Sequence, residues 1–515
     1  MEKHLKEPLH ISGLTTEKIN LVSRYFIKKP FVMIGLFLSF LLLRNWRVFL
    51  LTDVYDGYIA KINLVAGGFN FENIKHYIKH VALKEYDQHF IPVWFALFFC
   101  LVYIVDSNPR VLGFLSFGFG ACLLYLLFRI TGYFYGKKVN GNIFSLAVAL
   151  LFSSSLFFLE TIAWKWQLGL LISSVTYLFC IVIILERKDS IIWRIIYSAA
   201  LFTSIWTFGT SWLGAWGIVV FLLLRERNLK HNYLKLTIAI AVVGTLSQII
   251  ANTSSIHNIN IVYFLANLPA LLTLETANIF MLLSGVFRFT GTSQIYASDV
   301  LGVTVIAAVA LRYGRMYISR RLTEKDAMVV SLLLVYVLLI ALSLLRIMPK
   351  SGITPNISLE GYIFGNRYLF IYSIPLFIAV VIGCGEYFIR LSKPVIYTFM
   401  IGIVALGIVT EIAYPGFDSF TTNESRNKFY NLTLDAVKDA SSKKLVLPDL
   451  SGELFFQGPK TPLKLDHAVY IRDESYNYKL RFQDPATMTS QECKELHSDS
   501  LITTWLNLYN QSWCK

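Results

Sequence analysis

Residues 168–185 read LGLLISSVTYLFCIVIIL, an apolar run that contains no charged side chain. As an α-helix at 1.5 Å per residue, this run would extend about 27 Å, close to the ~30 Å hydrocarbon core of a bilayer. Comparable apolar runs cover Phe31–Leu51, Leu112–Phe128 and Val329–Leu345. Core helices of soluble proteins are usually shorter and amphipathic, so these runs predict helices that span a membrane.

The composition of the chain points the same way. Apolar residues make up 55% of its 515 residues and charged residues only 16%, whereas a soluble domain carries about a quarter charged residues. The net charge of +14 comes largely from short basic clusters between the apolar runs, which favours a cytoplasmic position for those loops. No basic soluble region is present in the pattern, so we expect no nucleic-acid partner.

The positions of the basic clusters predict an all-α polytopic membrane protein with about eleven transmembrane helices. Residues 1–30 are expected in the cytoplasm, and residues 31–414 form the membrane domain, with an external loop at 52–111. The expected spans are 31–51, 112–131, 142–159, 166–185, 190–207, 211–225, 235–252, 298–313, 326–346, 367–385 and 394–413. The apolar segment 91–105 is short for a span, and crossing there would place Lys137 and Lys138 outside. We therefore expect it to lie on, or dip into, the external surface of the membrane.

The last part of the chain has a different character. Pro415 and Gly416 mark a boundary, beyond which the charges are nearly balanced and short β-like runs alternate with helical stretches. Residues 415–515 are therefore expected to form a small external α/β domain. It contains Cys493 and Cys514, and the sequence leaves open whether they form a disulfide.

Carboxylates follow the first apolar run at the expected membrane boundary. Asp53 and Asp56 lie in the stretch TDVYDGY, where a carboxylate could accept the proton of an attacking hydroxyl group. The alternative is that these residues only mark the exit of the helix into water.

Further polar residues are expected on the same external side. They are candidates for substrate binding: Glu85, Asp87, His89, Glu160, Trp164, Lys165, Arg288, Arg367 and Tyr368. An external guanidinium could bind a lipid-linked phosphate through paired hydrogen bonds, and a tryptophan could stack on a sugar ring. The alternatives are an ion pair at the rim for each arginine and an ordinary interfacial anchor for Trp164.

The order of these parts resembles the GT-C superfamily of membrane glycosyltransferases. Four stretches are similar to segments of that family: EYDQHFIPVWFALF at 85–98, SNPR at 107–110, SSSLFFLETIAWKWQ at 153–167 and GNRYLF at 365–370. The resemblance implies a GT-C-like fold and a polyprenyl-phosphate sugar as donor. It also implies that Asp53 or Asp56 is the catalytic carboxylate. Many family members carry a tight acidic pair in that loop, whereas two residues separate Asp53 from Asp56, so which one acts stays open.

Within this superfamily, the size and the external tail are similar to bacterial and phage transferases that add glucose to O-antigen. This likeness implies an inner-membrane enzyme that transfers a hexose, glucose in the first instance, from undecaprenyl phosphate to a surface polysaccharide in the periplasm. The sequence does not decide whether a divalent cation takes part. Two alternatives remain: an O-antigen polymerase or ligase, and a transporter of polysaccharide or lipid-linked sugar.

Overall fold

The computed structural model describes ten helices and a few short segments of the chain. The described residues are 29–44, 74–75, 78, 90–104, 109–138, 140–155, 158, 161–162, 167–226, 232–251, 311, 323–351, 369–392, 394–398, 401–402, 405, 490–491 and 494. All regular structure within these residues is helical. Three of the helices are long and apolar enough to cross a membrane: Arg110–Tyr135, Leu168–Leu185 and Asn232–Ala251.

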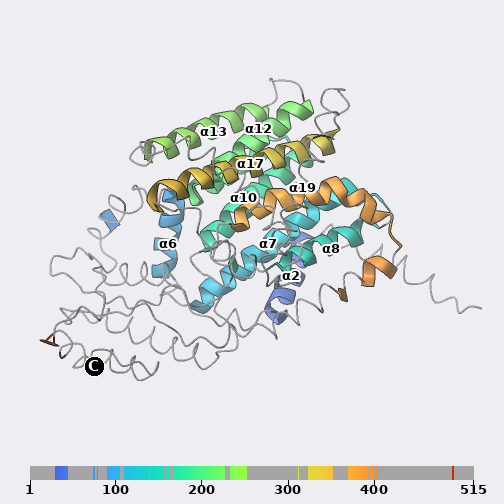
Figure 1. The fold of residues 1–515 in the computed structure, drawn as a ribbon, viewed down its shortest axis with the longest axis horizontal. Helices are drawn as coiled ribbons and strands as arrows, with labels where there is room; N and C mark the ends of the chain where they lie inside the picture. The colour runs from blue at the N-terminus through green and yellow to red at the C-terminus, as the bar shows by residue number, and fades with distance from the viewer. Residues whose placement is uncertain are drawn as a thin grey trace, which may run out of the picture.

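Helix α10 (Leu168–Leu185) is the central helix of the bundle, and nearly all of its side chains are buried. It packs against α7 (Pro109–Tyr135; Figure 1) and against α11 (Ile191–Thr207). A helix that is apolar on every face must be surrounded by protein or by lipid, and α10 is surrounded by other helices.

Three helices form a second layer beside α10. Helix α12 (Trp212–Glu226) lies between α13 (Asn232–Ala251) and α17 (Glu324–Ser351), and α17 packs in turn against α19 (Leu369–Ile389) (Figure 1). On the other side of the bundle, α2 (Pro30–Arg44) and α8 (Gly141–Ser153) both pack against α7.

Helix α6 (Pro92–Ile104) is inclined steeply to α12, α13 and α17 in Figure 1. Its 13 residues extend about 20 Å, which is short of a bilayer core. Trp94 and Phe98 on its inner face are almost completely buried, and the helix packs against α11. The placement of residues 91–105 at the external surface stays a prediction.

The outer faces of the bundle are apolar. Large apolar side chains are exposed on α11 and α13: Ile191, Ile192, Ile195, Phe202, Val243, Leu246, Ile249 and Ile250. A continuous apolar outer face is unfavourable in water and favourable against lipid acyl chains. Together with the three long apolar helices, this surface is consistent with an α-helical membrane protein.

Apart from α6, which covers the segment 91–105, the described helices overlap predicted spans, and most of their ends differ from the predicted ones by a few residues. Helix α7 starts at Pro109, earlier than the predicted residue 112, because proline is well tolerated in the first turn of a helix. Helix α8 ends at Ser153, before the predicted residue 159. Most of the predicted spans 298–313 and 394–413, and nearly all of the domain 415–515, lie outside the described residues.

Ion pairs join several helix termini at one end of the bundle, which we call the ionic end. Arg129 on α7 pairs with Glu186 at the end of α10, and Arg225 near the end of α12 lies 3.3 Å from Glu324 at the start of α17. Glu386 near the end of α19 lies 3.5 Å from Lys138 and 3.4 Å from Lys325. The basic clusters that predict the orientation of these helices therefore meet at the same end.

Candidate functional site

Every residue that the sequence predicts for the site lies outside the described residues. This applies to the proposed carboxylates Asp53 and Asp56 and to all the substrate-binding candidates: Glu85, Asp87, His89, Glu160, Trp164, Lys165, Arg288, Arg367 and Tyr368. Most of them are flanked in the chain by residues that the structure does describe, and these flanking residues have defined places in the bundle.

The flanking residues lie in the half of the bundle away from the ionic end. Helices α7 and α8 are joined by a short turn at the ionic end, and the shorter α8 ends near the middle of the bundle, where Phe152 contacts Phe377 of α19. The α11–α12 connection and the start of α19 lie at the end opposite the ionic end, because α12 and α19 both run towards the ionic end. The hydroxyl group of Tyr233 bonds to the carbonyl of Lys188 at the ionic end, so the last turns of α13 also lie at the opposite end.

Arg44 is the described residue that precedes Asp53 and Asp56, and it is a buried cation. It is the last residue of α2 and is only 9% exposed. Nη1 donates to Ser154 Oγ at 3.0 Å and to the carbonyl of Ser153 at 3.4 Å, both at the end of α8. The negative end of a helix dipole favours a guanidinium at this place. Arg44 therefore fixes α2 against α8 shortly before the chain reaches the two aspartates.

Phe90 follows His89 directly and is joined to α13. The side-chain amide of Gln248 accepts from the Phe90 N–H at 3.1 Å and donates to its carbonyl at 2.6 Å. Nearby, Trp94 packs on Gly169 at the start of α10, where an added Cβ would lie 2.7 Å from the indole ring. Phe90, the first described residue after the acidic segment 85–89, is thus tied to the last turns of α13, and α6 packs on the start of α10 through Trp94.

Residues on both sides of Glu160 pack against α2 and α7. Phe158 and Ile162 are completely buried, and both lie close to Gly120 on α7, where an added Cβ would be 3.2 Å from each of them. The same Cβ would be 3.6 Å from Leu41 on α2, one turn before Arg44. Four separate segments of the chain that lead to predicted site residues therefore lie in the half of the bundle away from the ionic end: those at Arg44, Phe90, Phe158 and Leu369.

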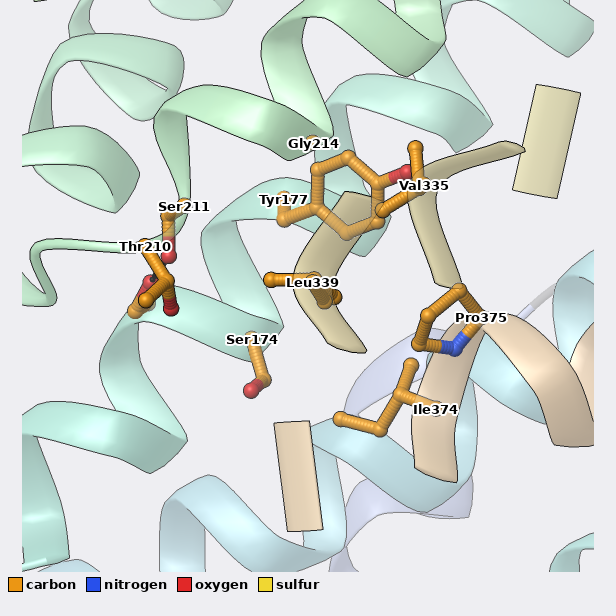
Figure 2. Close-up of a pocket in the computed structure, with 10 residues that line it drawn as sticks. Ser174, Tyr177, Thr210, Ser211, Gly214, Val335, Leu339, Ile374 and Pro375 are labelled. Atoms are coloured by element: carbon orange, nitrogen blue, oxygen red, sulfur yellow. Dashed lines mark hydrogen bonds between the residues drawn. The ribbon is translucent and has the colours of Figure 1, made fainter. Parts of the chain in front are cut away.

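A small cavity lined by hydroxyl groups lies in this half of the bundle. It has a volume of about 40 Å³ and is formed by α10, α12, α17 and α19 and by the α11–α12 connection (Figure 2). Its polar lining residues are Ser173, Ser174, Tyr177, Thr210 and Ser211, and its apolar ones are Gly214, Val335, Leu339, Ile374 and Pro375. A water molecule needs at least about 10–15 Å³, so the cavity has room for a few waters or for one small polar group of a ligand.

Part of the polar lining is already satisfied by hydrogen bonds. Ser173 Oγ donates to the carbonyl of Ser204 at 2.8 Å and lies 2.6 Å from Ser211 Oγ, while Ser204 Oγ donates to the carbonyl of Ser173 at 3.0 Å. Thr210 differs: its side chain is 3% exposed, and its Oγ1 has no hydrogen-bond partner among the described residues. A buried hydroxyl without a partner is unfavourable by about 1–3 kcal/mol, so water or a ligand is expected beside it.

Pro375 contributes to the cavity from inside α19. Proline has no amide hydrogen, so the carbonyl four residues earlier receives no helical hydrogen bond from it. This arrangement leaves an additional acceptor in the part of α19 that borders the cavity.

The described residues contain no group of three or more His, Cys, Asp and Glu side chains that could hold a metal ion. The four described cysteines, Cys100, Cys122, Cys180 and Cys384, are free thiols on helices, in line with their expected behaviour as apolar residues. The predicted carboxylates Asp53 and Asp56 are not among these residues, so this observation does not bear on whether a divalent cation takes part in the reaction.

Comparison with models of known protein families gives no match to this chain. Comparison with curated proteins also gives no match.

The hydroxyl-lined cavity was not predicted from the sequence. Its signals are the pairs Ser173-Ser174 and Thr210-Ser211, which interrupt otherwise apolar stretches. Single serines and threonines are common in membrane helices because they bond to their own backbone, as Thr176 does to the carbonyl of Ile172. Only the packing of α10 beside the α11–α12 connection brings the two pairs together.

Proposed function

We propose that this chain is an integral membrane glycosyltransferase of the GT-C type. It transfers a hexose, glucose in the first instance, from a polyprenyl-phosphate donor to a surface polysaccharide such as O-antigen. The polysaccharide meets the donor on the external side of the membrane, in bacteria the periplasmic face of the inner membrane. The resemblance of residues 85–98, 153–167 and 365–370 to segments of that family is the starting point.

The observation that carries the proposal is that segments distant in the chain share one half of the bundle. The first span, the acidic segment 85–89, the segment around Glu160 and the start of α19 are far apart in the sequence. Their described neighbours Arg44, Phe90, Phe158 and Leu369 nevertheless lie in the half of the bundle away from the ionic end. An interfacial site assembled from several loops needs such a convergence. The basic clusters gather at the ionic end, and this supports an external position for the opposite end.

The chemistry follows from the nature of the donor. Its lipid tail stays in the bilayer while its sugar is at the interface, where a polysaccharide hydroxyl can approach. Asp53 or Asp56 would accept the proton of that hydroxyl as its oxygen forms a bond to the anomeric carbon of the sugar. The bond from the anomeric carbon to the phosphate oxygen breaks, and polyprenyl phosphate leaves as an anion. Attack from the face opposite the leaving group inverts the anomeric configuration.

Cations have two roles in this scheme. Arg367 would bind the phosphate, whose charge grows as the glycosidic bond breaks. Arg44 would act as a positioning residue, because its hydrogen bonds to Ser153 and Ser154 fix the helix from which the chain continues to the aspartates.

The test is a transfer assay on membranes that contain full-length variants with matched expression. Asp53→Asn and Asp56→Asn keep the side-chain shape, and loss of the general base lowers the rate by about 10²–10⁴-fold in whichever variant removes it. Glu386→Gln is the matched control, because this carboxylate lies at the ionic end and is about half exposed. Mass spectrometry of the polysaccharide reports the hexose added to each repeat.

The outcomes separate the alternatives. Wild-type transfer by both Asp variants would show that the proposed site is wrong. A polysaccharide that changes in chain length or amount, with no hexose increment, would instead favour the polymerase or the transporter.

A further inference from the structure

The turn between α10 and α11 has an unusual residue at its central position. The N–H of Lys188 donates to the carbonyl of Ile183 at 3.3 Å, and the N–H of Arg187 donates to the carbonyl of Ile184 at 3.2 Å. These two bonds are those of a Schellman motif, which ends a helix with one residue in the left-handed conformation. That residue is Arg187, with a φ of 53°.

Glycine is the residue usually found at this position, because a side chain is disfavoured in the left-handed conformation. Among the described residues, Arg187 is the only non-glycine residue with a positive φ. Its side chain is exposed, so burial of the arginine does not account for its presence. An arginine in a conformation that favours glycine indicates that the cationic side chain, and not the backbone, has a function at this position.

Two further cations are fixed beside Arg187, and we call the three together the cationic turn (Arg187, Lys188 and Arg194). Lys188 Nζ lies 3.2 Å from Glu186 and 4.0 Å from the centre of the Trp193 ring. Arg194 Nε lies 2.8 Å from Asp189. Glu186 also pairs with Arg129, so the cations around the turn outnumber its carboxylates and the local charge is positive.

An apolar surface begins directly after the cationic turn, and we call it the isoleucine face (Ile191, Ile192 and Ile195). These side chains are 68%, 64% and 63% exposed. Trp193 lies in the same stretch of the chain, where its ring contacts Lys188 of the cationic turn, and tryptophan is enriched where headgroups meet acyl chains.

We propose that the cationic turn and the isoleucine face together bind an anionic phospholipid. The cationic turn holds the phosphate and any further negative charge of the headgroup, and the acyl chains lie along the isoleucine face. A neutral lipid would leave the excess positive charge unmatched, and a soluble phosphate would leave the isoleucines exposed. Only a ligand with both parts is complementary to both surfaces. This inference requires that the chain is embedded in a membrane and does not require sugar transfer.

The test uses full-length protein exchanged into bilayer nanodiscs that contain equal amounts of phosphatidylglycerol and phosphatidylcholine. Native mass spectrometry then gives the ratio of the two lipids retained by the protein. We expect the wild type to retain phosphatidylglycerol in preference. Each surface cation contributes on the order of a fivefold preference, so Arg187→Gly should lower the ratio by about that factor. Arg187→Lys should keep the preference, because it keeps the charge.

Arg187→Gly also separates binding from folding. Glycine is favoured at this φ, so the variant should unfold in phosphatidylcholine nanodiscs at the same temperature as the wild type or higher. Lys137→Gln is the matched control, an exposed cation at the same end of the bundle, and it should leave the lipid ratio unchanged. Arg194→Gln is a second variant of the site and should lower the ratio as Arg187→Gly does.

Three results would overturn the proposal. One is an unchanged ratio in both Arg187→Gly and Arg194→Gln. Another is an equal loss of preference in Lys137→Gln, which would show a general attraction without a site. The third is displacement of phosphatidylglycerol by millimolar glycerol phosphate, which would show that the turn binds a soluble phosphate and that the isoleucine face plays no part.

Discussion

Gly214 on α12 permits the close packing of Tyr177, which forms part of the wall of the hydroxyl-lined cavity. A Cβ added at Gly214 would lie 2.9 Å from Cε2 and 3.1 Å from Cδ2 of the Tyr177 ring. Carbon atoms in good contact are about 3.5–4.0 Å apart, so Gly214→Ala requires the ring or the helix to move by roughly half an ångström or more. Tyr177 is buried and the cavity that it borders is small, so the ring has limited room to move.

The expected magnitude is the difference of two opposing effects. Overpacking of a well-packed core typically destabilises a protein by about 1–3 kcal/mol. Alanine stabilises a helix interior by about 1 kcal/mol relative to glycine. We therefore expect Gly214→Ala to lower the free energy of unfolding by about 0–2 kcal/mol. Gly118→Ala on α7 is the matched control, because an added Cβ there meets nothing within 4 Å. This variant should be neutral or more stable by up to about 1 kcal/mol.

Unfolding of the purified protein in mixed micelles, followed by tryptophan fluorescence, gives both free energies. Subtracting the control removes the helix-propensity effect, so the two variants should differ by about 1–3 kcal/mol. The double variant Gly214→Ala/Tyr177→Leu should be more stable than the sum of the single changes, because the smaller side chain relieves the overlap. Equal effects of the two alanine variants, or strict additivity in the double variant, would refute the packing argument.

Three further predictions concern the half of the bundle away from the ionic end. Arg44→Ala should lower the free energy of unfolding by about 2–4 kcal/mol, measured in the same assay, because a buried charged hydrogen bond to Ser154 is lost; a change below about 0.5 kcal/mol would contradict the bond. Gln248→Leu removes both hydrogen bonds that the side-chain amide makes with the backbone of Phe90, so amide hydrogen exchange at Phe90 should become about tenfold faster. An unchanged exchange rate would contradict this. Thr210→Val should lower the free energy of unfolding by about 1 kcal/mol, because it removes the hydrogen bond expected between Oγ1 and a water or ligand in the cavity; equal or higher stability would show that Oγ1 has no such partner.

The helices that could be predicted most accurately are those with clear chemical boundaries. Helix α10 ends at Leu185 because Glu186, Arg187 and Lys188 follow it, and α11 begins at Ile191 after Ser190, whose side chain accepts from the Trp193 N–H at 3.4 Å. Length of the apolar run and a polar cap are both local properties of the sequence, so they can be seen without knowledge of the fold.

Helix α8 shows where local reasoning fails. The apolar pattern continues past Ser153, so the sequence predicts a helix to residue 159, yet α8 ends at Ser153. The carbonyl of Ser153 and the hydroxyl of Ser154 accept from Arg44, which belongs to a helix more than a hundred residues earlier. A helix end stabilised by a distant arginine cannot be found from apolar periodicity.

The candidate site was predictable only in part for the same reason. Individual residues such as Asp53 and His89 can be selected from the sequence by their chemistry and by the topology rule, and these assignments stay predictions. The arrangement of their described neighbours in one half of the bundle depends on contacts such as Gln248 with Phe90, at a separation of 158 residues. The cavity depends on α10 meeting the α11–α12 connection, which no local pattern indicates.

The ion pairs at the ionic end have a consequence for the order in which the protein is made. Lys138 and Arg225 leave the ribosome well before Glu386 and Glu324, their respective partners in the finished bundle. During synthesis these cations are therefore free of those later carboxylates and can act on the insertion machinery at full charge. When α17 and α19 arrive, the carboxylates neutralise part of that charge and join the late helices to the early ones. The same side chains thus direct insertion first and hold the assembled bundle afterwards, and a chain truncated before Glu324 would insert correctly but lack this closure.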